Sequence, residues 1–168
     1  MSAGQIIQWQ DLFALVDDGT IPMSRLHTIE AAMHQQVRQF PDGIAFLVIL
    51  PPGARPPPEE VQRSVRERLG RLGPSLLCLA YLVEGTGFKA VAARAALVGM
   101  KIFAPRDYPI YVETSLHAVL LRVLPHLESG KQGRTDPAAI IRAIEYGRLA
   151  PAGAPPTVTP RAGDARPK

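Results

Sequence analysis

Residues 44–50 read Ile-Ala-Phe-Leu-Val-Ile-Leu, and residues 76–83 read Leu-Leu-Cys-Leu-Ala-Tyr-Leu-Val. Both stretches are apolar at nearly every position, which is typical of strands that helices cover on both faces of a sheet. Neither stretch approaches the roughly 18 apolar residues that a membrane-spanning helix needs. They therefore predict buried strands at the centre of an α/β domain, and no membrane span.

Helical periodicity surrounds these two strands. Apolar residues recur at steps of three and four over residues 22–40, and again over residues 61–72. Pro58 suits the first turn of the second helix, because a proline there loses no backbone hydrogen bond. Upstream, residues 5–9 and 12–16 are rich in Ile, Trp, Phe and Val, which favours two short strands. These form either a hairpin or one bent strand.

The second half of the chain continues the alternation. We expect a helix over residues 87–102, a short strand over residues 108–112 and a helix over residues 115–124. The later strands are separated by helices long enough for parallel crossovers. The predicted fold class is α/β, a sandwich built on a mixed, mostly parallel sheet of four to five strands with about four helices.

The chain divides into one domain and a tail. Its 168 residues suffice for a single core, which we place in residues 1–128. Asp136-Pro137 predicts the start of a short appended helix within residues 129–148. Pro, Ala, Gly and Arg predominate in residues 149–168, so we expect that segment to be a disordered tail.

The net positive charge of the chain comes from the residues that follow the predicted domain. Residues 1–128 contain 12 Lys and Arg against 12 Asp and Glu, whereas residues 129–168 contain 7 against 3. A neutral folded domain is not expected to bind nucleic acid. The single cysteine, Cys78, lies in an apolar run, which predicts a buried, unreactive thiol and agrees with a reducing compartment. Because the N-terminus lacks the pattern of an export signal, we expect a cytoplasmic protein.

A glycine-rich turn is the sharpest chemical motif. Residues 85–90, Gly-Thr-Gly-Phe-Lys-Ala, fit the spacing G-x-G-x-x-A between a strand and a helix, where backbone N–H groups can hold a phosphate. Dinucleotide-binding folds place this turn after their first strand, whereas only one predicted strand follows it here. Gly85, Thr86, Gly87 and Lys89 are therefore candidates for a ligand-binding or phosphorylated turn, with an ordinary helix cap at Thr86 as the simpler interpretation.

No catalytic or metal-binding pattern is present in the sequence. The chain contains no H-E-x-x-H, G-x-S-x-G, P-loop or C-x-x-C motif. None of the four histidines lies beside a cysteine or carboxylate at the spacing of a metal site. We predict no catalytic residues, no metal and no cofactor, and a protein that is not an enzyme.

The helix predicted over residues 87–102 is apolar on more than one face. The regular stripe predicted to face the sheet comprises Phe88, Val91, Ala92, Ala95, Gly99 and Ile102. Further small and apolar residues lie off that stripe. They predict that a second face of this helix is also covered, by another part of the chain or by a partner. Either the appended helix folds over this face, or a second copy of the chain or a different protein does. The candidate interface residues are Arg55, Ala90, Ala93, Arg94, Leu97 and Met100.

The same part of the chain resembles a known family. The strand at residues 79–83, the helix that follows it, the strand at residues 108–112, and Ser115 and Ala118 resemble the closing half of STAS domains, which include the anti-sigma factor antagonists of bacteria. The resemblance covers roughly residues 5–126 and consists of apolar patterns. It implies a STAS-like sandwich and a role in bacterial signalling.

One family feature is missing. In partner-switching STAS proteins, the loop after the central strand carries a serine that a kinase phosphorylates, whereas residues 51–58 here contain no Ser or Thr. The resemblance therefore implies a protein–protein interaction module that is not phospho-switched. The alternative function, from the residues alone, is a small anion, nucleotide or lipid binder that uses the turn from Glu84 to Lys89.

Overall fold

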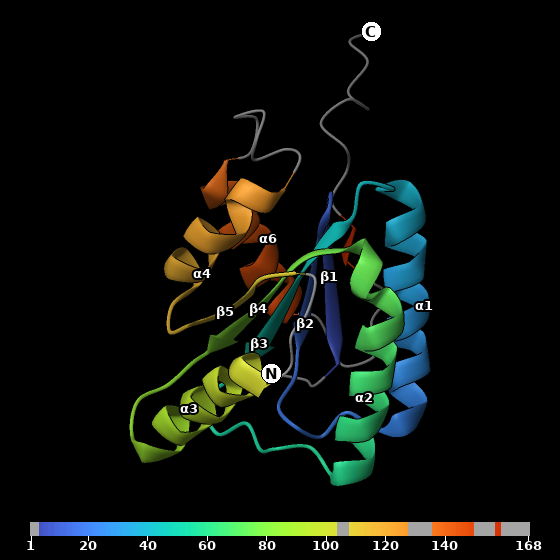
Figure 1. Ribbon diagram of the computed structural model, residues 1–168. Coiled ribbons are helices and arrows are strands. Elements are labelled where there is room, and N and C mark those ends of the chain that lie inside the picture. The colour runs from blue at the N-terminus through green and yellow to red at the C-terminus, as the bar shows by residue number, and fades with distance from the viewer. Residues whose placement is uncertain (1–3, 104–107, 128–135, 150–156, 159–168) are drawn as a thin grey trace, which may run out of the picture.

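The chain forms the expected α/β sandwich (Figure 1). The structure, a computed structural model, describes residues 4–103, 108–127, 136–149 and 157–158, with the backbone alone for residues 99–103 and 157–158. In this part of the chain the strands form one mixed sheet in the order β5-β4-β3-β2-β1-β6. The predicted fold class is confirmed.

The first two strands form a hairpin, which settles the choice between a hairpin and one bent strand. β1 (Gln5–Trp9) and β2 (Leu12–Val16) pair antiparallel. The two-residue turn between them holds Gln10 at a φ of 49°. The buried side chain of Gln36 donates hydrogen bonds to the backbone carbonyls of Gln10 and Leu12 and so fixes this turn against the first helix.

The remaining long strands are parallel to β2. They are β3 (Ile44–Leu50), β4 (Leu76–Val83) and β5 (Ile110–Glu113). The crossovers between them are α1 (Met23–Gln39), α2 (Glu59–Leu72) followed by the short η1 (Gly73–Ser75), and α3 (Phe88–Phe103). Each crossover moves one strand along the sheet in the same direction, so the right-handed rule places all three helices on one face.

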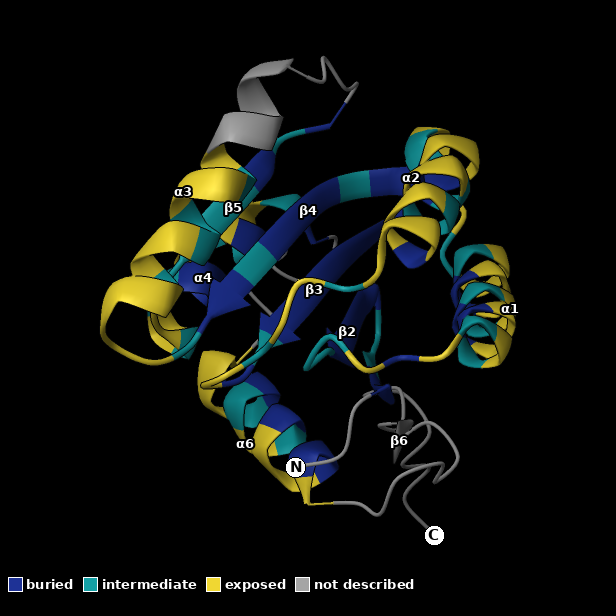
Figure 2. Cartoon of the chain, turned by 90° about the horizontal axis from the view of Figure 1, so that it is seen from below, coloured by how far each residue is buried: buried dark blue, intermediate teal, exposed yellow. Residues whose placement is uncertain are grey.

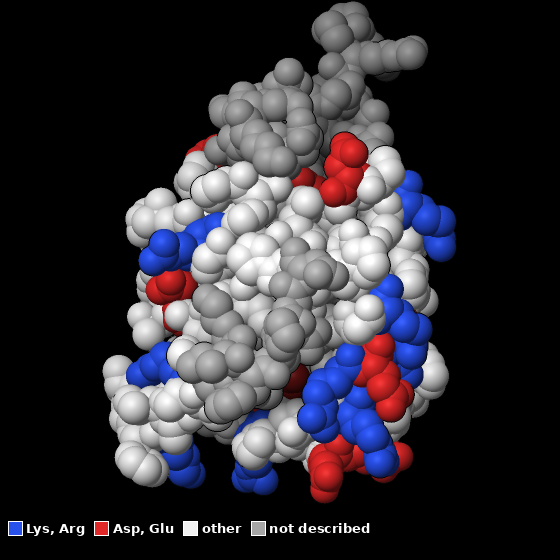
Figure 3. All heavy atoms as spheres, viewed as in Figure 1, with Lys and Arg blue, Asp and Glu red and all other residues white. Residues whose placement is uncertain are grey.

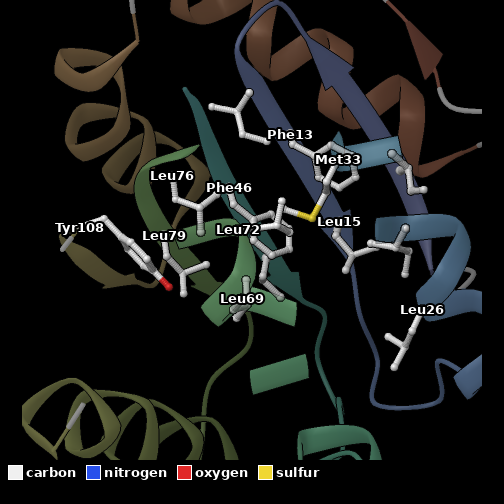
Figure 4. Packing of buried hydrophobic residues seen from close by; sticks show 14 of the residues in the cluster. Phe13, Leu15, Leu26, Met33, Phe46, Leu69, Leu72, Leu76, Leu79 and Tyr108 are labelled. Atoms are coloured by element: carbon white, nitrogen blue, oxygen red, sulfur yellow. The ribbon is translucent and has the colours of Figure 1, made fainter. Parts of the chain in front are cut away.

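The face under α1 and α2 is closely packed (Figure 4). Leu26 and Met33 of α1 and Leu69 of α2 belong to one buried cluster with Phe13 and Phe46 from the sheet. The two rings meet edge to face, with their centroids 5.7 Å apart. This packing holds α1 and α2 firmly on the sheet.

Two helices cover the opposite face. They are α4 (Leu116–Val123), which ends in the short η2 (Leu124–His126), and α6 (Pro137–Arg148). The predicted start of α6 is confirmed: Asp136 caps it by accepting a hydrogen bond from the Ala138 N–H. α6 packs so closely on β1 that a Cβ added at Gly147 would lie 2.4 Å from Ile7 Cγ1.

Within the predicted tail, the structure describes Leu149 and one two-residue strand. β6 (Thr157–Val158) pairs parallel with β1 at Ile7 and Gln8. The rest of the segment predicted to be disordered lies outside the described residues. None of the described helices combines the length and the apolar character needed to cross a membrane.

Candidate functional site

The candidate turn lies where the parallel strands end. The Glu84 N–H donates to the Leu50 carbonyl at 2.9 Å, which places the turn after β4 beside the start of the loop after β3. The Arg55 N–H of that loop donates to the Asp18 carbonyl at 3.0 Å. Three loops from successive strands therefore lie side by side at this edge, the usual place for functional residues in an α/β fold.

The turn itself is open to solvent. Gly85 and Gly87 have φ values of 93° and 94°, a region that residues with a side chain rarely adopt. α3 begins at Phe88, so Gly87 and not Thr86 precedes the first helical residue. The prediction that Thr86 caps the helix is therefore wrong. Thr86 and Lys89 are both exposed.

Glu84, the residue before the turn, forms an ion pair with a buried arginine. Arg148 of α6, whose side chain is 8% exposed, donates from Nη1 to Glu84 Oε1 at 2.8 Å. Glu145 also lies near this guanidinium, at 3.8 Å. Nε and Nη2 of Arg148 are buried without a hydrogen-bond partner. The pair fixes the end of β4 to α6, and it places two carboxylates close to the turn.

α3 presents to solvent the face that was predicted to be buried (Figure 2). Phe88, Val91 and Val98 are 86%, 54% and 46% exposed, and Ala92 and Ala95 are exposed with them. None of residues 88–98, the part of α3 with described side chains, belongs to either core cluster. The predicted orientation of this helix is wrong, because its second apolar stripe is the one that faces the sheet.

The residues predicted to form the interface do not lie on one exposed surface. Ala90, Ala93, Arg94 and Leu97 are half-buried, and Arg94 Nη1 donates a long hydrogen bond of 3.5 Å to the Val83 carbonyl of β4. These residues lie on the inner side of α3. Arg55 is exposed, on the neighbouring loop. The side chain of Met100 lies outside the described residues.

The appended helix does not cover α3. Ile140 and Ile144 of α6 are buried against the opposite face of the sheet, together with residues of α4 and β1. The alternative in which α6 folds over α3 is therefore wrong. In the described part of the chain the apolar row of α3 has no cover.

The outer surface of α1 and α2 is charged, unlike the exposed row of α3 (Figure 3). Glu30 of α1 forms ion pairs with Arg68 and Arg71 of α2. Acidic and basic side chains alternate over these two helices, at the lower right of Figure 3. The described surface over α3, at the lower left, is white and blue without red.

The structure offers little support for metal or thiol chemistry among the described residues. No three His, Cys, Asp or Glu side chains there could hold a metal ion together. Cys78 is fully buried, as predicted. Burial, reinforced by the negative charge of Asp11, raises the pKa of its thiol to about 12, so the thiol stays protonated at neutral pH.

A small cavity lies at the other edge of the sheet, where the parallel strands begin. Its volume is about 190 Å³. The polar side chains that line it are Asp11, Gln39, Asp42 and His126. They come from three segments of the chain that lie far apart in the sequence, so no local motif pointed to them. The same is true of the Glu84–Arg148 pair, whose members are 64 positions apart.

The strongest candidate site is therefore the exposed row of α3 together with the turn that leads into it. Comparisons of the chain with protein-family models, with curated proteins and with solved structures found no match. The function has to be inferred from these surfaces.

Proposed function

We propose that this chain is a non-enzymatic protein–protein interaction module that binds its partner through the exposed row of α3, formed by Phe88, Val91, Ala92, Ala95 and Val98. The observation that carries the proposal is that a crossover helix of the sandwich leaves all five of these residues exposed, four of them from the stripe that was predicted to face the sheet. An uncovered group of large apolar side chains on one surface is typical of an interaction site.

The energetics favour burial of this row. Covering a large apolar side chain contributes about 1.5–3 kcal/mol when its whole surface leaves water. Phe88 exposes the largest share of its surface of any of the described large hydrophobic residues, at 86%. The alanines between the larger residues would let a partner approach the helix closely. The row therefore combines one aromatic side chain with a shallow surface of small residues.

The resemblance to STAS domains supports a signalling role in a bacterial cytoplasm. Members of that family with partner-switching activity act by binding other proteins. Residues 51–58 contain no Ser or Thr that could take the place of the phosphorylated serine. In our proposal the interaction is accordingly constitutive and not controlled by phosphorylation of this loop.

A test can be made in the cells that produce the protein. A photo-crosslinking amino acid at position 91 should give one defined protein adduct, and the added substitution Val98→Glu should remove it. Leu121 of α4 is 61% exposed and gives a matched control position on the other face. No adduct at position 91, or the same adduct at positions 91 and 121, would contradict the proposed interface.

The alternative function is a small anion, nucleotide or lipid binder at the turn. The exposed Thr86 and Lys89 beside the start of α3 favour it, whereas the carboxylate of Glu84 at the same turn opposes anion binding. Titration with phosphate and with ATP, observed through the backbone amide signals of Thr86 and Gly87, separates the two functions. Shifts that saturate would support the alternative, and unchanged signals would exclude those two ligands.

A further inference from the structure

We propose that the cavity at the edge where the parallel strands begin binds a small organic cation. This edge is opposite to the turn that leads into α3, so the site is separate from the proposed protein interface. The cavity has a volume of about 190 Å³. A space of about 150 Å³ can hold a molecule the size of benzene. The cavity therefore has room for a ligand of a few carbon atoms and one charged group.

The fold fixes the walls of the cavity. Asp11 lies in the hairpin turn between β1 and β2, and its carbonyl accepts a hydrogen bond of 2.8 Å from a backbone N–H of β3. In the loop after α1, Gly43 has a φ of 114°, and a Cβ added there would lie 3.0 Å from the side chain of Leu77. The hydroxyl of Tyr111 and Nε2 of His126 lie 2.8 Å apart, which holds the imidazole in place. The cavity is therefore preformed.

The charges that line the cavity are negative. Among the described residues of its lining, Asp11 and Asp42 are acidic and none is a lysine or arginine. Only 2% of Asp11 is exposed, so water screens its carboxylate weakly. The same charge adds to burial in raising the pKa of the Cys78 thiol. The end of α1 at Gln39 and Phe40 also lines the cavity and contributes the negative end of the helix dipole. This lining attracts a cation and repels an anion.

The lining favours an organic cation over a metal ion. No three His, Cys, Asp or Glu side chains among the described residues could hold a metal together. Phe40, Pro41 and Leu77 give the cavity apolar walls, which suit a short carbon body. An ammonium group on that body would donate charge-assisted hydrogen bonds to the carboxylates. A primary amine with a short alkyl chain combines both features.

The test compares three probes of similar size that differ in charge: butylammonium, butanol and butyrate. Each is titrated into the full-length chain while the backbone amide signals of Asp11, Gly43 and Leu77 are followed by NMR. We expect butylammonium to saturate these shifts with a Kd of about 1 mM. Butanol should bind at least about tenfold more weakly, because it lacks the charge. Butyrate should give no shift at these positions.

Two substitutions locate the site. Asp42→Asn removes one carboxylate at the exposed rim and should weaken butylammonium binding about tenfold. Glu60→Gln is the matched control, because Glu60 is equally exposed but lies at the start of α2, and binding should be unchanged. Leu77→Phe fills part of the cavity and should abolish binding, provided that its circular dichroism matches that of the parent.

Three kinds of result would overturn the site. The first is equal binding of the three probes, or no saturation by butylammonium. The second is butylammonium binding that Asp42→Asn leaves unchanged. The third is equal weakening by Asp42→Asn and Glu60→Gln, which would mean that the amine responds only to the net charge of the surface. None of these results bears on the interface at α3, which the crosslinking experiment tests separately.

Discussion

α2 and α3 lie on the same face of the same sheet but use their apolar residues in opposite ways. α2 buries Val61, Leu69 and Leu72 and exposes a surface in which acidic and basic residues alternate. Over residues 88–98, the part of α3 whose side chains the structure describes, the apolar row Phe88, Val91, Ala92, Ala95 and Val98 is exposed and no residue is fully buried. The difference indicates that α2 is part of the core, whereas the outer side of α3 leaves its apolar row exposed to solvent.

We expect the largest loss in the free energy of unfolding from a substitution in α2, and almost none from one in α3. Leu69→Ala should lower the free energy of unfolding by about 3 kcal/mol, because it leaves a cavity beside Phe46 in the packed face. Val98→Ala on α3 should change it by less than about 0.5 kcal/mol. Urea unfolding followed by circular dichroism measures both. Comparable losses in the two variants would mean that the exposed row of α3 is part of the core after all.

The second prediction concerns the ion pair that fixes the end of β4 to α6. Glu84→Gln should cost about 2 kcal/mol, since it leaves the buried guanidinium of Arg148 without its close carboxylate partner. Glu145→Gln is the matched control, because this carboxylate is 57% exposed and 3.8 Å away, and it should have little effect. The same urea measurement applies. Equal effects of the two substitutions would show that the Glu84–Arg148 pair has no special role.

Some of these elements could be predicted from the sequence, and others could not. The strands at residues 44–50 and 76–83 were predictable because they are apolar on both faces, and the start of α6 because Asp136 and Pro137 form a local cap. The orientation of α3 was not predictable, because both of its stripes are apolar and periodicity cannot rank them. The hairpin was ambiguous, since its Gln10-Asp11 turn lacks the usual glycine or asparagine.

The free energy of unfolding should depend on pH through the buried thiol of Cys78 in β4. The pKa of the Cys78 thiol is raised from 9.0 to about 12 by burial. Above pH about 9 the unfolded chain therefore releases a proton that the folded chain retains, and the free energy of unfolding falls with rising pH, by at most about 1.4 kcal/mol per unit. Cys78→Ala should show a shallower decline over the same range. Parallel pH profiles for the two proteins would contradict a buried, protonated thiol.

The smallest effect is expected on the charged outer surface of α2. Arg71 pairs with Glu30 at 2.9 Å, but its side chain is 58% exposed. Such a pair is screened by water and salt, so Arg71→Gln should change the free energy of unfolding by less than about 0.5 kcal/mol. Binding of the partner should be unaffected. A loss of binding in this variant would move the interface from α3 to α2.

The exposed row of α3 can be tested most directly by thiol labelling in cells and in the purified protein. Val98→Cys places a thiol in the row, and Leu121→Cys places one on α4, both in a Cys78→Ala background. In the purified protein both thiols should react rapidly with a maleimide. In cells, a bound partner should protect position 98 and leave position 121 reactive. Equal labelling of the two positions in cells would contradict the account of α3 as a covered interface.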